Sequence, residues 1–241
     1  MTHSDELTFE RDGDVIRGYI ARPDRDGPFP GLVLIPDVRG LSSHYQDVAR
    51  RFAAEGFLTY AVDLYSREGA PELPDLQAVF QWIAALPDPR VIADLAGAVR
   101  RLAAHPEVRS DAVGITGFCL GGQYALMAAC SVPQLAACVS WYGMLRYPER
   151  NERKPNSPLD LAPSLHCPFL GLFGAEDAII PLDDVEALRA ILSRARKSFE
   201  IEVYSGAGHA FFNDTRADAY RPDAAAQAWP RAVAFLREHL G

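Results

Sequence analysis

The feature that most constrains the fold of this chain is a short run of small residues around a cysteine. Residues 114–122 read Gly-Ile-Thr-Gly-Phe-Cys-Leu-Gly-Gly, and a helix-forming run, 123–130, follows them. A strand that meets a Gly-x-Cys-x-Gly turn and then a helix is the nucleophile-elbow pattern, with a thiol in place of the usual hydroxyl. Side chains two positions before and after the nucleophile would collide on so tight a turn, and Gly117 and Gly121 remove those collisions. The pattern predicts a strand, turn and helix with Cys119 at the turn.

Cys119 is therefore the candidate nucleophile. A cysteine at this place lies at the amino end of a helix, where unpaired backbone N–H groups and the helix dipole favour its thiolate. The same N–H groups can bind a developing oxyanion.

The rest of the chain alternates between strand and helix patterns. Residues 7–10 and 15–21 alternate around Asp12-Gly13-Asp14 and predict an antiparallel hairpin. Apolar runs then predict buried strands at 31–36, 58–63, 112–116, 135–142, 169–173 and 199–204, and helical patterns cover 45–55, 76–85, 90–104, 123–130, 183–194 and 223–239. The charged segment 146–163, with four prolines, predicts a surface loop. This order predicts an α/β fold with a mainly parallel central sheet, helices on both faces and an N-terminal hairpin.

Four reactive side chains follow predicted strands. Asp37 follows 31–36, Cys119 follows 112–116, Asp177 follows 169–173 and His209 follows 199–204. Loops at the carboxyl ends of parallel strands carry the active residues of such sheets. We therefore expect these four side chains to meet at one edge.

Length and charge limit the classes of partner. A chain of 241 residues can bury a substantial core, and we expect residues 1–241 to form a single domain. The formal net charge of −8 offers no basic footprint for nucleic acid or an anionic membrane, so a small-molecule partner is expected. The sequence has no apolar stretch of membrane-spanning length, and the polar, acidic N-terminus is unlike a signal peptide, so we expect a cytoplasmic protein. The oligomeric state is left open.

The four cysteines show neither C-x-x-C pairs nor the Cys/His spacings of a zinc site, so no metal is expected. Cys130, Cys138 and Cys167 lie in apolar surroundings, which indicates small core residues. A reducing compartment suits all four.

A nucleophilic thiol needs a base, and His209 is the candidate. It lies in a glycine-bearing loop after a strand, where a mobile imidazole can be presented, and imidazole can take and return a proton near neutral pH. Asp177 is the natural third member, because a carboxylate fixes the tautomer of the imidazole and supports its cation; Glu176 is a rival for that position. The chain order nucleophile, acid, base is that of the α/β-hydrolases.

Several motifs together resemble the dienelactone hydrolase family of α/β-hydrolases. They follow the opening hairpin and read Pro-Asp-Val-Arg-Gly-Leu at 36–41, Val-Asp-Leu-Tyr at 62–65, Gly-Phe-Cys-Leu-Gly-Gly at 117–122, Trp-Tyr-Gly at 141–143 and Gly-His-Ala-Phe at 208–211. The resemblance implies hydrolysis of small carboxylic esters or lactones through a thioester acyl-enzyme. It also implies oxyanion donors in the backbone N–H groups of Leu120 and Val38, and neither a metal nor an organic cofactor.

Asp37 stands where the best-known family members carry a glutamate that contacts the resting thiol. Aspartate keeps the charge and is one methylene shorter. Three roles are open for Asp37: holding a neutral thiol, acting through water, or ordering its loop. A carboxylate there opposes the effect of the helix terminus, so the resting protonation state of Cys119 stays open as well.

Substrate-binding residues are less clearly marked. Family members that take dienelactone carry an arginine four residues after the base, where this chain has Asn213, so dienelactone itself is a doubtful substrate. Arg39 and Arg67 are the best-placed substitutes for binding a carboxylate, although both could be solvated loop charges. Candidate pocket-lining aromatic residues, each with a core position as the alternative, are Phe118, Tyr142 and Phe211.

Two other functions use the same residues. A non-catalytic ligand-binding protein could retain the fold if Asp37 kept Cys119 protonated. A redox-sensing protein could use the oxidation of Cys119, although no resolving cysteine lies near it in the sequence.

Overall fold

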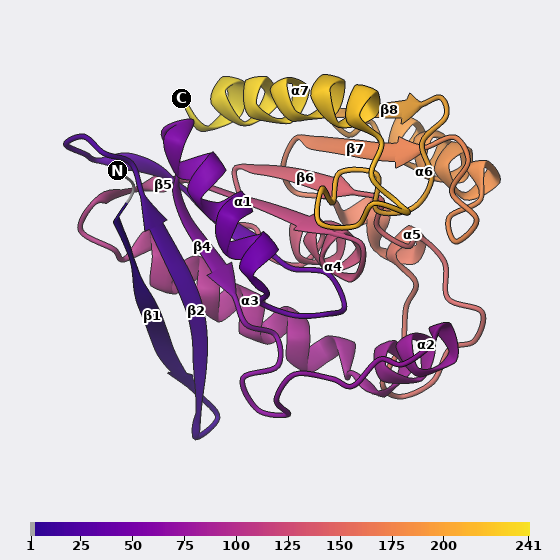
Figure 1. Ribbon diagram of the computed structural model, residues 1–241, viewed down its shortest axis with the longest axis horizontal. Coiled ribbons are helices and arrows are strands. Elements are labelled where there is room, and N and C mark those ends of the chain that lie inside the picture. The colour runs from indigo at the N-terminus through magenta and orange to yellow at the C-terminus, as the bar shows by residue number, and fades with distance from the viewer. Residues whose placement is uncertain (1–2) are drawn as a thin grey trace.

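The computed structural model describes residues 3–241. Residues 1 and 2, which belong to the predicted domain and to the acidic N-terminal stretch, lie outside the described residues. The chain opens on a long hairpin of strands β1 (His3–Arg11) and β2 (Asp14–Arg22), which pair antiparallel along their whole length (Figure 1). Asp12 and Gly13 form the turn, both with positive φ, which suits the two central positions of a tight hairpin turn. The predicted hairpin is confirmed.

The hairpin is the edge of one continuous sheet. In the described part of the chain this sheet has eight strands in the order β1-β2-β4-β3-β5-β6-β7-β8. Strand β2 pairs antiparallel with β4, and all later pairs are parallel. The parallel strands are β3 (Phe29–Ile35), β4 (Leu58–Val62), β5 (Val108–Phe118), β6 (Ala137–Trp141), β7 (Phe169–Gly174) and β8 (Phe199–Tyr204). Strands β4 and β6 are buried at every position, as continuous apolar runs in a covered parallel sheet should be.

Helices cover both faces of this sheet (Figure 1). Those on one face, α1 and α7, meet where Phe52 packs on Trp229 with ring centroids 4.4 Å apart. On the other face α3 and α4 pack together behind β5. The helical elements are α1 (Ser43–Ala54), α2 (Leu76–Ala85), α3 (Asp88–Ala103), α4 (Leu120–Ala129), α5 (Pro158–Leu161), the 3₁₀ turn η1 (Ala162–Ser164), α6 (Leu182–Arg194) and α7 (Pro222–Leu240). The predicted α/β-hydrolase fold, with its mainly parallel sheet, is confirmed.

The segment 146–163 differs from the predicted surface loop. It contains α5, begins η1, and buries Lys154 and Ser157. The Lys154 Nζ lies 2.5 Å from Asp88 Oδ1, and Ser157 caps α5. The charged composition suggested solvent exposure, but an ion pair to α3 allows one of these charges to enter the interior.

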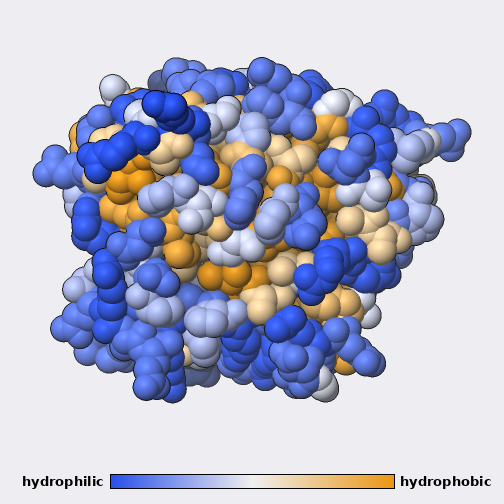
Figure 2. Space-filling model, turned by 180° about the vertical axis from the view of Figure 1, so that it is seen from behind, coloured by the Kyte–Doolittle hydropathy of each residue, from blue (hydrophilic) through white to orange (hydrophobic). Residues whose placement is uncertain are grey.

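None of the helices within residues 3–241 has the length and apolar character of a membrane span. The face seen in Figure 2 carries mainly hydrophilic residues, with hydrophobic patches between them. The carboxyl ends of β3, β5, β7 and β8 lead into the loops of the candidate site.

Candidate active site

The backbone at Cys119 is strained. Cys119 precedes the first residue of α4 with φ 56° and ψ −115°, a combination that non-glycine residues rarely adopt. Its N–H donates to the carbonyl oxygen of Trp141 at 3.0 Å, and its carbonyl accepts from the N–H of Gln123 at 3.0 Å. Strand β6 and the first turn of α4 therefore hold the turn in place.

The two glycines of the elbow have the predicted steric role. A Cβ on Gly117 would lie 2.0 Å from the carbonyl oxygen of Gly121, and a Cβ on Gly121 would lie 2.1 Å from that of Ile35. Both obstacles are backbone atoms, which cannot rotate away. The strand, turn and helix can pack this closely only because both residues are glycine.

The structure brings three of the predicted site residues into one chain of contacts. The Nε2 of His209 lies 3.0 Å from the Sγ of Cys119, and its Nδ1 lies 2.9 Å from the Oδ2 of Asp177. The Oδ1 of Asp177 accepts from the N–H groups of Ile179 and Ile180 at 2.8 and 3.1 Å. This carboxylate is thus fixed on one side by backbone and turned on the other side to the imidazole.

Glu176, the rival for that position, is exposed, whereas Asp177 is buried. The N–H of Glu176 donates to the carbonyl of Ala207, which joins the loop that carries the carboxylate to the loop that carries the imidazole. A Cβ on Gly174 would lie 2.3 Å from that same carbonyl oxygen, so glycine is needed for this approach of the two loops.

Charge and burial act in opposite directions on His209. Burial disfavours the imidazolium and lowers its pKa, but the negative charge of the Cys119 sulfur and the hydrogen bond and charge of Asp177 outweigh burial and raise the pKa of His209 to about 10. Its side chain is 16% exposed, and Cys119 is partly exposed, so both can be reached from solvent. This arrangement favours a protonated His209 at neutral pH.

Asp37 is buried at the end of β3 and is engaged by its own loop. Its Oδ1 accepts from the N–H of Arg39 at 2.8 Å, and Tyr45 makes a side-chain hydrogen bond with it. Burial, together with the nearby charges of Asp37 and Cys119, raises the pKa of Tyr45 well above its ordinary value, so Tyr45 keeps the proton it donates. Within the described residues, the hydrogen-bond partner of the Cys119 sulfur is His209 and not Asp37.

The two backbone donors implied by the family resemblance lie beside this group. Val38 follows Asp37, and Leu120 follows Cys119 as the first residue of α4. In the part of the chain that the structure describes, the N–H groups of Val38 and Leu120 have no hydrogen-bond acceptor, although both residues are buried. The carbonyl of Val38, in the peptide unit after the one that carries its N–H, accepts from the hydroxyl of Tyr65 at 2.9 Å.

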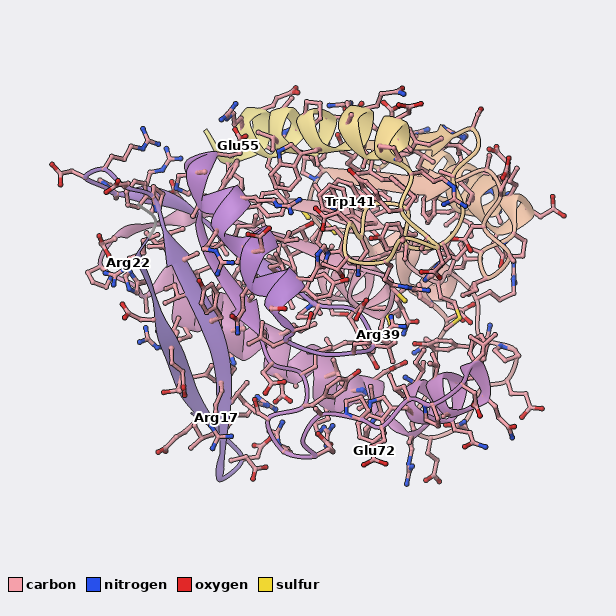
Figure 3. The ribbon with its side chains drawn as sticks, viewed as in Figure 1. Arg17, Arg22, Arg39, Glu55, Glu72 and Trp141 are labelled. Atoms are coloured by element: carbon pink, nitrogen blue, oxygen red, sulfur yellow. The ribbon has the colours of Figure 1, made fainter. Side chains whose placement is uncertain are left out.

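The two arginines have different positions. Arg39 lies on the loop after β3, half-exposed, with its Nη1 3.7 Å from Asp37 Oδ2 (Figure 3). Arg67 does not belong to this group: its Nη1 lies 2.5 Å from Asp94 and its Nε 2.6 Å from Asp14. Two carboxylates already neutralise the guanidinium of Arg67, so the prediction that it binds substrate is corrected.

The predicted lining aromatic residues are core residues. Phe118, Tyr142 and Phe211 have no exposed surface. Phe118 stacks on Trp141, with ring centroids 5.1 Å apart. Tyr142 is the member nearest the chemistry, with its ring edge-on to His209 at 5.4 Å. These three rings pack in the core beneath the catalytic residues and do not line a pocket, which was the alternative given for each of them.

Asn213 does not take the role of the arginine that other family members carry at this position. It is buried, and its Oδ1 accepts from the N–H and the hydroxyl of Thr215 at 3.1 and 2.7 Å. The amide closes its own turn. Within residues 3–241 no group of three or more His, Cys, Asp or Glu side chains is arranged to hold a metal ion.

A polar cluster behind α4 was missed by the sequence analysis. Asp88 accepts from the hydroxyls of Tyr124 and Tyr147, both at 2.8 Å, besides its pair with Lys154, and Gln123 donates to Tyr147 at 2.6 Å. Gln123 and Tyr124 lie on the elbow helix. The partners are far apart in sequence and follow no motif, so no local signal could have identified the cluster.

The fold and the elbow together define an α/β-hydrolase. The family model described as "Dienelactone hydrolase family" matches residues 16–240. The chain belongs to the dienelactone hydrolase family and is a hydrolase of that family.

Individual relatives agree with this assignment. The chain is 38% identical over 228 residues to a Bradyrhizobium protein named "Probable 2-oxo-3-(5-oxofuran-2-ylidene)propanoate lactonase", covering 95% of this chain and 91% of that protein. It is also 38% identical to an Escherichia coli K12 protein named "Putative carboxymethylenebutenolidase", covering 95% of this chain and 84% of the relative. A crystal structure from Klebsiella pneumoniae subsp. pneumoniae, titled "Putative Dienelactone Hydrolase", superposes with a TM-score of 0.93 at 38% identity over 99% of each chain.

Proposed function

We propose that the protein hydrolyses small carboxylic esters or lactones through a thioester on Cys119. The observation that carries the proposal is the continuous contact from the Cys119 sulfur through the His209 ring to the Asp177 carboxylate, at 3.0 and 2.9 Å. A thiolate, a base and a group that orients the base are the requirements of nucleophilic acyl transfer.

In the first half-reaction the Cys119 thiolate attacks the ester carbonyl carbon and a tetrahedral oxyanion forms. The unpaired N–H groups of Val38 and Leu120 stabilise that oxyanion. As the intermediate collapses, the C–O bond breaks and the departing alkoxide takes the proton from Nε2 of His209. The products are an alcohol and a thioester.

In the second half-reaction His209 takes a proton from a water molecule, which attacks the thioester carbonyl. Collapse of the second oxyanion breaks the C–S bond, and the acid and the thiolate are released. Asp177 holds the ring with Nδ1 protonated, so that Nε2 faces the reacting atoms throughout. No step calls for a metal or an organic cofactor.

The role we propose for Asp37 is to order the oxyanion loop. Its hydrogen bonds go to the Arg39 N–H and to Tyr45, which fixes the chain on both sides of Val38. Asp37 is therefore a positioning residue. Of the two predicted arginines, we still propose Arg39 as a substrate contact, because it lies half-exposed on the loop after β3.

The proposal also keeps three expectations from the sequence: a small-molecule partner, one domain and a cytoplasmic location. A single continuous sheet from β1 to β8 supports one domain. The negative net charge supports a partner other than nucleic acid.

The test is hydrolysis of an activated aryl ester before and after thiol alkylation, with the labelled residue identified by mass spectrometry. The proposal expects loss of turnover in proportion to the labelling of Cys119. Buried Cys130 should stay unlabelled, because burial raises its pKa to about 12 and keeps the thiol protonated. Labelling of Cys119 in a protein with no esterase activity would instead favour a ligand-binding or redox-sensing function.

A further inference from the structure

An apolar groove lies between helix α2 and the segment that follows β6. It encloses about 710 Å³, the size of a small-molecule site, and its surface is mainly apolar. Six of the residues that line it carry the argument: Leu76, Phe80, Ile83, Met144, Tyr147 and Lys154.

The wall formed by α2 is unusual for a helix surface. Leu76 is 58% exposed and Phe80 41% exposed, although both are large and apolar. Two such side chains lie on neighbouring turns of one helix and line a hollow. An exposed apolar surface of this kind is typical of a binding site.

The opposite wall of the groove is connected to the catalytic group through neighbouring residues. Met144 comes two residues after Tyr142, whose ring packs edge-on against His209. Tyr147 accepts a hydrogen bond from Gln123, one turn of helix after Cys119. Tyr142 and Gln123 therefore link this wall of the groove to His209 and Cys119.

The α2 wall is also connected to the proposed oxyanion loop. Trp82 packs edge-on against Tyr65 with ring centroids 5.4 Å apart, and the hydroxyl of Tyr65 donates to the carbonyl of Val38. The α2 wall is thus linked to the Val38 loop, and the opposite wall is linked to Cys119 and His209. The proposed position of the ester carbonyl lies between these two groups.

Charge selects among possible occupants. Lys154 is the single cation among the lining residues, and Asp88 pairs with it in the interior. Glu149 lines the rim as an anion. A carboxylate would find no free cation in this groove, whereas a neutral hydrocarbon chain would be desolvated on apolar surface.

We propose that this groove binds the hydrocarbon chain of a neutral ester whose carbonyl lies at Cys119, so that the substrates are medium-chain aliphatic esters. The inference rests on the proposed function for the position of the carbonyl. A second hollow, of about 810 Å³ between Pro23 and Arg237, lies at the amino edge of the sheet, away from the triad, and is lined largely by charged and small residues.

A binding test that needs no turnover uses the Cys119→Ala protein with ¹³C-methyl methionine. The chain has three methionines, so Met144 and Met127 give few signals to assign. Methyl octanoate should shift the Met144 methyl signal saturably. Methyl acetate at the same concentration should leave that signal in place.

The kinetic test is a series of p-nitrophenyl esters from butyrate to octanoate on the intact protein. Full burial of a methylene is worth about fourfold in binding, so a groove open on one side should raise kcat/KM about twofold per methylene. The Phe80→Gln protein should lower the octanoate-to-butyrate ratio about fivefold or more. Val15→Gln is the matched control, because Val15 is exposed to the same extent, at 42%, on the hairpin strand β2.

The outcomes separate the two proposals. Ester turnover with no Met144 shift and a flat chain-length series would overturn the groove and leave the proposed function standing. A saturable Met144 shift in a protein that shows neither turnover nor acylation of Cys119 would retain the groove and reject the esterase. A Met144 shift that depends on protein concentration without ester would show that a second copy of the chain covers the groove, and would overturn the inference.

Discussion

Replacing Asp177 by asparagine should reverse the tautomer of His209. One carboxylate oxygen of Asp177 is held by the N–H groups of Ile179 and Ile180, which can only donate, so the amide oxygen of the new side chain must take that place. Its NH₂ group then faces Nδ1, 2.9 Å away, and can only donate as well. Nδ1 becomes an acceptor and the proton moves to Nε2, which can no longer accept one from Cys119 or water.

The loss that this reversal causes is large. A wrong tautomer in a triad lowers kcat about 10⁴-fold, equivalent to about 5 kcal/mol of transition-state stabilisation. The assay is kcat for an activated aryl ester at pH 7.5, with Glu176→Gln as the control, because Glu176 is exposed and adjacent in sequence. A loss below tenfold for Asp177→Asn, or an equal loss in the control, would refute the reasoning.

Three further tests by substitution address the elbow, the pKa of His209 and the buried ion pair. Gly121→Ala puts a methyl group 2.1 Å from a backbone carbonyl oxygen, so Tm should fall by about 10 °C or more in a thermal melt. The pKa of His209 is raised to about 10, so its proton stabilises the folded state fully below pH 6.5, and this contribution is lost as the pH rises toward 10. Replacing Cys119 by alanine should move the NMR titration midpoint of His209 to lower pH. An unchanged midpoint would contradict a thiolate at Cys119. Lys154→Met leaves Asp88 buried without its cation and should cost about 3–5 kcal/mol in denaturant unfolding, part of which Asp88→Asn should restore.

The parts of the fold that could be predicted are those with local signals. The strand, turn and helix at Cys119 follow from glycine spacing, and the parallel strands follow from short apolar runs between turn residues. The elbow helix starts at Leu120, three residues before the predicted start, because tertiary packing against β5 and β6 overrides the poor helix propensity of two glycines.

The parts that could not be predicted depend on partners far along the chain. Lys154 meets Asp88 across 66 residues, and Arg67 meets Asp94 across 27. A charged residue in a loop gives no indication of whether such a partner exists. For the same reason the sequence could not decide whether Phe118 lines a pocket or packs in the core, since either position suits an aromatic ring beside a sheet edge.

The most direct test of the central claim is the mass of the intact protein, quenched within milliseconds of mixing with an activated ester. The account predicts a mass increase equal to one acyl group, carried on Cys119, that decays as acid is released and persists when His209 is replaced by glutamine. Hydrolysis that continues in the Cys119→Ala protein, or turnover with no acyl adduct at any time, would contradict it.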